Sequence, residues 1–120
     1  MPAQLETLKQ RLSEDDEITI SVTGRKSGRT ISNPVWFVVE NETLYLLPVK
    51  GSDTEWYKNV LKNPAMQIQA GDARAQVKVT PVTDPKQVAS VVEKFRAKHG
   101  PGNVKKYYSK FDVAVTAPLH

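Results

Sequence analysis

Short segments in which hydrophobic and polar residues alternate constrain the fold of this chain more than any other feature. In residues 18–23, Ile18, Ile20 and Val22 alternate with hydroxyl side chains, which is typical of a half-buried β-strand. Further strands are predicted over residues 31–39, 43–49, 65–70, 73–79 and 111–116. Hairpin signals such as Gly71-Asp72 join neighbouring strands, and there are no serial βαβ units. The sequence therefore predicts a mostly antiparallel barrel with peripheral helices.

The second predicted strand, residues 31–39, is apolar on both faces around Trp36 and Phe37. This pattern indicates a central strand, or a strand with one face covered by a partner or a ligand. Pro34 lacks a backbone N–H, so we expect a bulge or an unpaired position there. Because Trp36 and Val38 would present apolar surface outward, the sequence also favours a homodimer.

Helices are predicted at several places, and the clearest signals begin at Asp84. Asp84 followed by Pro85 is typical of an N-cap and a first helical position, and Gly100-Pro101 ends this helix. Its apolar face has helical spacing and contains Val88, Val91, Val92 and Phe95. Ser52 followed by Glu55 has capping-box spacing, which predicts a helix over residues 53–61. Residues 3–13 are predicted to form an amphipathic helix, and residues 103–108 a helical turn.

The composition excludes several kinds of site. The chain has 120 residues, which suits a single domain over residues 1–120, and it has no cysteine for disulfides or thiolate chemistry. Two histidines are too few for an imidazole metal cage. The formal net charge of +4 favours anionic partners. No apolar run approaches the ~18 residues of a membrane span and no signal peptide is visible, so we expect a cytoplasmic protein.

Two basic turns predict a site for an anionic ligand. Residues 23–29 contain Arg25, Lys26 and Arg29 around the Ser27 hydroxyl, and charge-assisted donors of this kind favour anions. The second turn, residues 50–52, leads directly into a predicted helix N-terminus, where free N–H groups also favour an anion. We expect the cations of both turns, Lys50 included, to converge on one ligand. Each turn taken alone is also typical of a solvated hairpin.

Trp56, in the first turn of the predicted helix, extends this hypothesis to a ring-bearing ligand. Its indole could pack against a flat ring, although a tryptophan at such a position is more often a core anchor. The pocket would then hold a phosphorylated, ring-bearing cofactor.

The usual catalytic groups are missing from the sequence. His99 and His120 do not suit a Ser–His–Asp triad, and residues 24–28 lack the glycine spacing of a P-loop. If the chain is an enzyme, a cofactor must therefore supply the reactive group. Hydride transfer fits this pattern, with Tyr107 and Tyr108 as candidate catalytic proton donors. Both tyrosines could equally be packing residues.

The turn at residues 23–29, Asn33-Pro34, Lys50-Gly51 and Trp56 with Asn59 resemble the deazaflavin-dependent nitroreductase family. That family belongs to the flavin-binding, pyridoxamine-phosphate-oxidase-like split β-barrels. The resemblance implies a mainly β (α+β) fold: a six-stranded antiparallel split β-barrel with two to three peripheral helices. It also implies that an 8-hydroxy-5-deazaflavin coenzyme or FMN passes a hydride to a small-molecule electron acceptor, such as a quinone, an enone or a nitroaromatic.

The resemblance also assigns roles to residues. Arg25, Lys26 and Ser27 would hold phosphate or tail carboxylates, residues 47–50 would follow the ring edge, and Trp56 with Asn59 would close the site. The full set of expected cofactor-binding residues is Arg25, Lys26, Ser27, Arg29, Asn33, Pro48, Val49, Lys50, Gly51, Trp56 and Asn59. No metal ligands are expected.

Other functions remain open at this stage. The same barrel could store or sense a flavin or deazaflavin without turnover. Residues 105–110, Lys-Lys-Tyr-Tyr-Ser-Lys, interleave basic and aromatic side chains as single-strand nucleic-acid sites do, but few features there would read a base. The same patch could bind a membrane surface, although the chain lacks an amphipathic basic helix.

Overall fold

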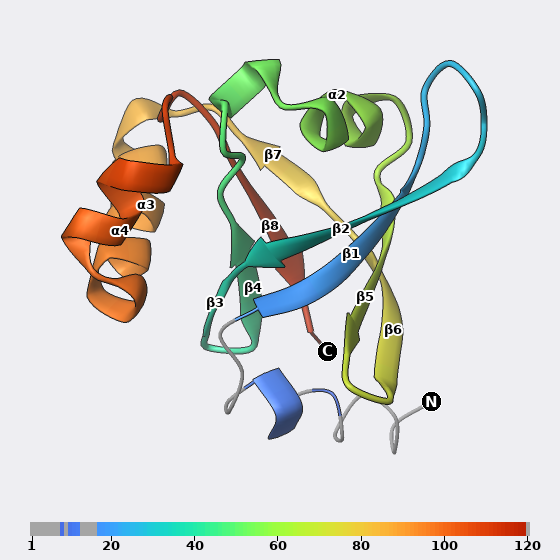
Figure 1. Cartoon of the computed structure of the whole chain (residues 1–120), viewed down its shortest axis with the longest axis horizontal. Helices are drawn as coiled ribbons and strands as arrows, with labels where there is room; N and C mark the ends of the chain where they lie inside the picture. Colours follow the sequence, from blue (N-terminus) through green and yellow to red (C-terminus); the bar gives the residue numbers. More distant parts are fainter. Residues whose placement is uncertain (1–7, 9, 13–16, 120) are drawn as a thin grey trace.

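The computed structural model describes residues 8, 10–12 and 17–119, and these form two four-stranded antiparallel sheets (Figure 1). The first sheet has the order β2-β1-β5-β6, with β1 (Glu17–Thr23), β2 (Thr30–Trp36), β5 (Ala65–Ala70) and β6 (Ala73–Lys78). The second has the order β3-β4-β8-β7, with β3 (Val38–Glu40), β4 (Thr43–Leu46), β7 (Thr80–Val82) and β8 (Ala114–Pro118). The remaining elements are η1 (Gly51–Asp53), α2 (Glu55–Lys62), α3 (Pro85–His99) and α4 (Pro101–Tyr107).

The predicted strand over residues 31–39 is wrong in one respect, because it breaks at Phe37 into β2 and β3. The Phe37 side chain is fully buried, while its carbonyl accepts a hydrogen bond from Lys98 Nζ at 3.0 Å and lies 3.1 Å from His99 Nε2. Because residues of α3 bind this carbonyl, it is not paired with a neighbouring strand. The chain passes from the first sheet to the second at this point.

A second strand also changes sheets. The predicted strand over residues 73–79 ends as β6 at Lys78, and the chain continues in the other sheet as β7. Between them, Val79 N–H donates to the Pro64 carbonyl at 2.9 Å. The six strands of the predicted split β-barrel are therefore eight in the described residues, and they form two four-stranded sheets and no closed barrel. The broader prediction of a mostly antiparallel, mainly β, α+β fold is confirmed.

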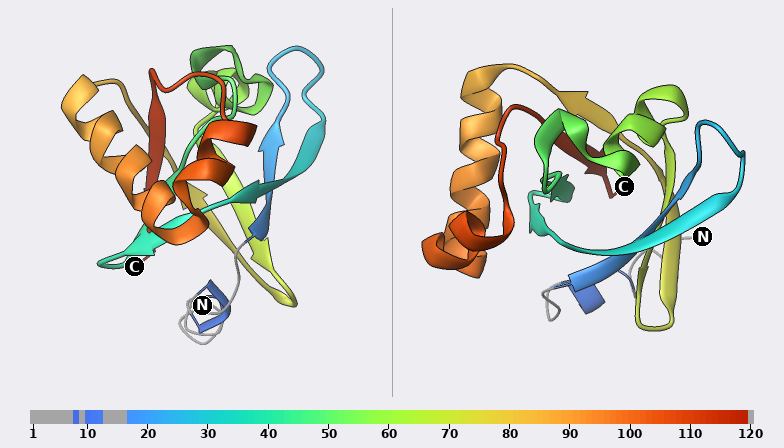
Figure 2. Two further views of the ribbon diagram at one scale, coloured as in Figure 1. Left: turned by 60° about the vertical axis from the view of Figure 1, so that its left-hand side comes forward. Right: turned by 45° about the horizontal axis from the view of Figure 1, so that its top comes forward.

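The main core lies between the two sheets. As predicted, Ile18, Ile20 and Val22 of β1 face inward, with exposures of 3%, 0% and 2%. Figure 2 shows α2 across one open end of the space between the sheets, where Trp56 and Val60 complete this core. The hydrophobic effect on this shared interior is the main stabilising term of the fold.

A second core lies between α3, α4 and the outer side of the second sheet (Figure 2). The predicted apolar face of α3 is confirmed, because its four residues Val88, Val91, Val92 and Phe95 are all buried. The predicted cap is also confirmed: Asp84 Oδ2 accepts from Gln87 N–H at 3.2 Å. Val38 is 7% exposed beneath α3. The prediction that Val38 presents outward surface for a dimer is therefore wrong.

Two other expectations concern the helices. Most of the helix predicted over residues 3–13 lies outside the described residues. Within that range the structure describes residues 8 and 10–12, and these are helical. The helical turn predicted at residues 103–108 is the longer α4. Among the described helices, none has both the length and the hydrophobicity that spanning a membrane requires.

Candidate functional site

The edge strand β2 contributes residues to two cavities, one nearer each of its ends. Ile31, Asn33 and Val35 lie opposite Val22, Ile20 and Ile18 in the antiparallel pairing with β1. Directly opposed residues share a face of the sheet, so these three side chains point to the same side as the buried ones of β1. Ile31 and Asn33 line a cavity of about 320 Å³. Val35 lines a second one of about 310 Å³, together with Pro34 and Trp36 from the other face of the strand.

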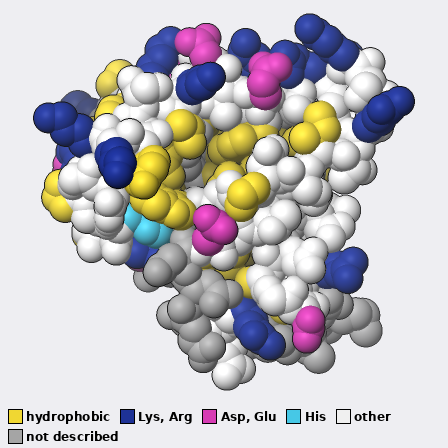
Figure 3. All heavy atoms as spheres, viewed as in Figure 1, with side chains coloured by type: hydrophobic (Ala, Val, Ile, Leu, Met, Phe, Trp, Pro, Cys, Tyr) yellow, Lys and Arg dark blue, Asp and Glu magenta, His cyan; other side chains and the backbone are white. Residues whose placement is uncertain are grey.

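Figure 3 shows the corresponding face of the molecule as a hollow in which hydrophobic side chains gather, with Lys and Arg side chains along its upper edge. Both volumes fall at the lower end of the roughly 300–1,000 Å³ typical of small-molecule sites. Two neighbouring cavities along one strand would suit a ligand with two chemically different parts.

The first cavity, here called the polar cavity, lies between the β1–β2 turn and α2. The turn contributes residues 24–27, and α2 contributes Glu55, Trp56 and Asn59. Asn59 is 4% exposed, and its Oδ1 accepts from the Arg25 backbone N–H at 3.1 Å and from Arg25 Nη1 at 2.8 Å. Arg25 Nη2 also pairs with the Glu55 carboxylate at 3.3 Å. Arg25 and Asn59 thus bind each other and hold the turn against α2.

The turn itself is closed by its own backbone. Gly24 N–H donates to the Arg29 carbonyl at 2.8 Å, and Gly28 N–H donates to the Gly24 carbonyl at 2.9 Å. Gly28 has φ +72°, a left-handed conformation that glycine adopts without steric cost. Ser27 Oγ accepts from Arg29 N–H at 3.2 Å. The side chains of Lys26 and Arg29 are left exposed around this compact turn.

The second cavity, here called the aromatic cavity, lies between the end of β2, the segment after β4, and α4. Its lining residues are Glu17, Pro34, Val35, Trp36, Leu47, Val49, Tyr107 and Tyr108. The Trp36 ring stacks on His99 at 4.7 Å between centroids and meets the Tyr107 ring edge-on at 5.4 Å. Burial raises the pKa of Tyr108 above its ordinary value of 10.0, which makes its hydroxyl a weaker acid. Tyr107 is 51% exposed.

The predicted tyrosines thus lie in this cavity, together with Leu47 and Val49 of the expected ring-edge segment, but the prediction did not include Trp36 among the site residues. The sequence did contain a signal for Trp36. Its strand is apolar on both faces, a pattern for which a ligand-covered face was one of the two explanations.

Trp56 belongs mainly to the core. It is 5% exposed and packs in the main cluster between the sheets, so only a small part of the indole reaches the polar cavity. The indole therefore has little exposed surface for the expected packing against a ligand ring. Pro48 is also buried, whereas Val49 is 40% exposed.

The second basic turn has a different partner from the predicted ligand. Ser52 N–H donates to Asp112 Oδ1 at 2.9 Å, and Ser52 Oγ donates to Asp112 Oδ2 at 2.6 Å. The predicted capping box is wrong, because Ser52 bonds this distant carboxylate and α2 begins only at Glu55, with Thr54 as its N-cap. An anion does lie at this turn, as the sequence indicated, but it belongs to the chain itself.

The predicted convergence of all four cations is not what the structure shows. Figure 1 places the β1–β2 turn and the η1 turn on opposite sides of α2. Arg25 and Lys26 line the polar cavity, while Arg29 and Lys50 line neither of the two cavities. Lys50 instead forms an isolated parallel bridge to Lys110. The two turns therefore make two separate environments.

The basic and aromatic run at residues 105–110 is also divided in space. Tyr107 packs against Trp36, and Tyr108 is buried. Lys110 Nζ lies 3.3 Å from Asp53 and 3.7 Å from Asp112. Since these members of the run have partners within the chain, the run does not form the continuous strip that single-stranded nucleic acid follows.

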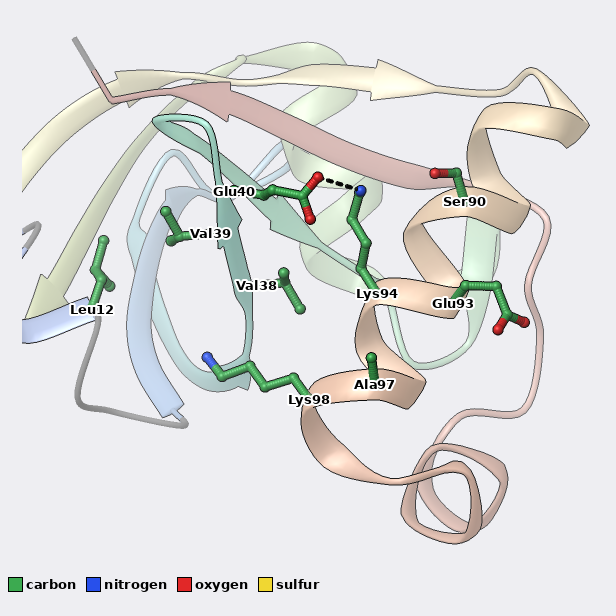
Figure 4. A pocket seen from close by; sticks show the side chains of 9 residues that line it. All are labelled: Leu12, Val38, Val39, Glu40, Ser90, Glu93, Lys94, Ala97 and Lys98. Atoms are coloured by element: carbon green, nitrogen blue, oxygen red, sulfur yellow. Dashed lines mark hydrogen bonds and ion pairs between the residues drawn. The ribbon is translucent and has the colours of Figure 1, made fainter.

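A further cavity, of about 680 Å³, lies between β3 and α3 (Figure 4). Lys94 Nζ pairs with Glu40 Oε1 across it at 2.9 Å, and Lys98 Nζ lies 3.6 Å from the centre of the Phe37 ring. These contacts join α3 to β3. None of the predicted site residues lines this cavity.

The comparisons with known proteins agree with this fold. Residues 8–117 match a family described as "Uncharacterized protein conserved in bacteria (DUF2255)". The chain belongs to this family. Membership of the deazaflavin-dependent nitroreductase family, which the sequence resembles, is not confirmed. No curated protein matches the chain in sequence.

Solved structures similar to this DUF2255 chain include an F420-H2 dependent reductase, with 21% identity and a TM-score of 0.63 over 85% of this chain and 93% of the other. A putative pyridoxamine 5'-phosphate oxidase from Listeria innocua has 12% identity and a TM-score of 0.66 over 94% and 90%. A structure described as a domain-swapped dimer has 19% identity and a TM-score of 0.66 over 98% and 99%. At these identities, the likeness shows a shared fold and nothing finer.

Proposed function

We propose that this DUF2255 protein is a reductase that binds a reduced 8-hydroxy-5-deazaflavin coenzyme or reduced FMN along β2. The observation that carries this proposal is the pair of cavities along one strand, one aromatic and one beside a basic turn. A ring joined to an anionic tail has the same two parts. The fold is also that of a protein named as an F420-H2 dependent reductase.

The aromatic cavity suits the ring. Trp36, Leu47 and Val49 provide apolar surface there, and the Trp36 ring is held in place by its stacking on His99 and its edge contact with Tyr107. A rigid apolar slot orients a flat ring and excludes water from the reacting carbon. The bound coenzyme supplies a hydride for an electrophilic acceptor such as a quinone, an enone or a nitroaromatic.

The basic turn suits the tail. Lys26 lines the polar cavity and Arg29 lies in the same turn, and neither forms an ion pair with a described residue. Both are therefore available for charge-assisted hydrogen bonds to phosphate or carboxylate oxygens. Ser27 and Asn33 add neutral polar groups beside Lys26. Arg25 has a different role in this proposal, because it is bonded to Asn59 and Glu55 and so supports the turn.

Tyr107 and Tyr108 are the proposed proton donors for the reduced acceptor. Both line the aromatic cavity. Burial raises the pKa of Tyr108, so its hydroxyl is suited to donating a hydrogen bond more than to releasing its proton. A protonated phenol can hydrogen-bond an acceptor oxygen as negative charge develops on it. The exposed Tyr107 lies at the side of the cavity formed by α4.

Titration of the purified protein with F420 and with FMN tests this function. We expect saturable quenching of the fluorescence of one of the two cofactors, followed by oxidation of the reduced form when a quinone or nitroaromatic is added. Binding without turnover of any acceptor would instead support a flavin- or deazaflavin-storing protein. Absence of binding to both cofactors would reject the proposal.

Self-association is a separate proposal. A similar structure is described as a domain-swapped dimer, and we propose that this chain also forms a homodimer. Light scattering during size-exclusion chromatography tests this, and a monomeric mass at all concentrations tried would contradict it.

A further inference from the structure

Residues 49–52, after β4, lie beside residues 109–112, before β8. Each contact joins residues that are 60 positions apart in the sequence. Ser109 N–H and Oγ both donate to the Val49 carbonyl, at 2.9 and 3.3 Å, and Lys50 forms a parallel bridge with Lys110. Ser52 then meets Asp112 through the two hydrogen bonds described above. We call this contact between residues 49–53 and 109–112 the clasp.

Asp112 is the residue at which the clasp is strongest. Both of its carboxylate oxygens accept a hydrogen bond from Ser52, and bonds to a charged acceptor are stronger than neutral ones. Gly51 confirms how close the carboxylate lies, because a Cβ at that position would be 2.0 Å from Asp112 Oδ1. The Ser52–Asp112 bonds are exposed as well, but they are two bonds in fixed geometry. The Lys110 side chain adds only exposed ion pairs to Asp53 and Asp112, at 3.3 and 3.7 Å, which contribute little.

The clasp joins the two walls of the aromatic cavity. Val49 belongs to one segment, and Tyr107 and Tyr108 immediately precede the other. Each of these side chains lies within three residues of a clasp contact. The spacing between Val49 and the two tyrosines is therefore set by how residues 49–53 sit against residues 109–112.

We propose that Asp112 is a positioning residue of the aromatic cavity, which fixes its width for a flat ring and at the same time fills the anion-accepting turn at Gly51-Ser52 with its own carboxylate. The identity of the ring rests on the proposed function. Two consequences follow. Loss of Asp112 weakens binding of the ring whether or not the ligand has a charged tail, and the tail binds at the β1–β2 turn.

Riboflavin and FMN separate these consequences, because they share a ring and differ in the phosphate. For Asp112→Ala we expect about five- to tenfold weaker binding of both ligands, by a similar factor, as for loss of a hydrogen-bonded charge. Lys26→Ala should weaken FMN by a comparable factor and leave riboflavin unchanged. Lys110→Ala is the matched control, and it should change neither affinity by more than about twofold, since its ion pairs are exposed.

Asp112→Asn distinguishes positioning from charge. Its amide oxygen can accept from Ser52 N–H while its amide nitrogen donates to Ser52 Oγ, so we expect it to restore riboflavin affinity to within about twofold of wild type. Ser52→Ala, which removes one of the two bonds, is the second variant if Asp112→Ala does not fold. An unchanged riboflavin affinity in the folded variant overturns the proposal. Tighter FMN binding by Asp112→Ala also overturns it, because the vacated turn would then be the phosphate site.

Amide hydrogen exchange without ligand keeps the two proposals apart. We expect faster exchange in Asp112→Ala at residues 49–52 and 107–110, and wild-type rates in β1 and β5. If wild-type protein binds neither F420, FMN nor riboflavin, the proposed function fails. The role of Asp112 is then judged on exchange alone, where unchanged rates at residues 49–52 and 107–110 would reject it.

Discussion

Arg25 and Asn59, which lie 34 residues apart, share one oxygen atom: Asn59 Oδ1 accepts from both the backbone N–H and the guanidinium of Arg25. Asn59 is the buried polar residue among the described side chains, at 4% exposure. This pair attaches the basic β1–β2 turn to α2 and so fixes the position of Lys26 beside the polar cavity.

Asn59→Ala should lower the free energy of unfolding by about 1–3 kcal/mol, because it leaves the part-buried Arg25 N–H without its acceptor. Urea denaturation measures this. Asn59→Asp keeps an oxygen at the same place, so its free energy of unfolding should fall much less than that of Asn59→Ala. The matched surface variant Glu55→Ala removes the ion pairs of one exposed carboxylate, with Arg25 and with Lys58, and should change stability by less than about 1 kcal/mol. Equal losses in Asn59→Ala and Glu55→Ala would contradict this account.

Gly51→Ala should destabilise the protein by about 1–3 kcal/mol. Gly51 has φ +56°, which favours glycine, and the added Cβ would meet Asp112 Oδ1 at 2.0 Å. Gly102→Ala is the control: nothing lies within 4 Å of a Cβ there, and Gly102 is in α4, where alanine is the better helix former. Thermal melts should therefore show opposite shifts for the two variants, and a stable Gly51→Ala would show that the clasp is not tightly packed.

Much of the fold could be predicted from local patterns in the sequence. The alternation in β1 and the spacing of Val88, Val91, Val92 and Phe95 in α3 are set by which face is buried, and the local sequence contains that information. Asp84 caps α3 through a residue three positions away. Each of these predictions depends on neighbours within a few residues, and each is confirmed.

The predictions that were wrong depended on residues distant in sequence. Phe37 ends β2 because Lys98, 61 residues away, takes its carbonyl. Ser52 does not cap α2 because its hydroxyl donates its hydrogen bond to Asp112, 60 residues away. The sequence could not show which tryptophan, Trp36 or Trp56, is the better candidate for contact with a ligand ring. Only the packing of α2 across the end of the main core shows that Trp56 belongs to that core.

Tyr108 should make the protein less stable in alkali. Burial raises its pKa above the ordinary 10.0, so above that pH the unfolded chain releases a proton that the folded chain retains, and unfolding becomes easier as pH rises. Urea midpoints at about pH 9 and about pH 11 should fall further for wild type than for Tyr108→Phe. A fall of the same size in both proteins would show that Tyr108 is not the cause.

Trp56→Ala should cost about 3–5 kcal/mol of stability, as expected for removing a large side chain from the main core. Trp56→Phe should retain a folded protein with near wild-type cofactor affinity, because the indole has little surface in the polar cavity. Chemical denaturation and cofactor titration measure the two effects separately. If Trp56→Phe folded normally but lost cofactor binding, Trp56 would be a ligand contact rather than a core residue.

The most direct test of the central claim is a fluorescence titration of FMN and F420 against wild type, Trp36→Leu and Lys26→Ala. The account predicts saturable binding by wild type and a loss of about 1–3 kcal/mol of binding free energy in each variant, one through the ring and one through the tail. Binding that is unaffected by both substitutions would contradict the placement of a ring and an anionic tail along β2, as would the absence of any binding by wild type.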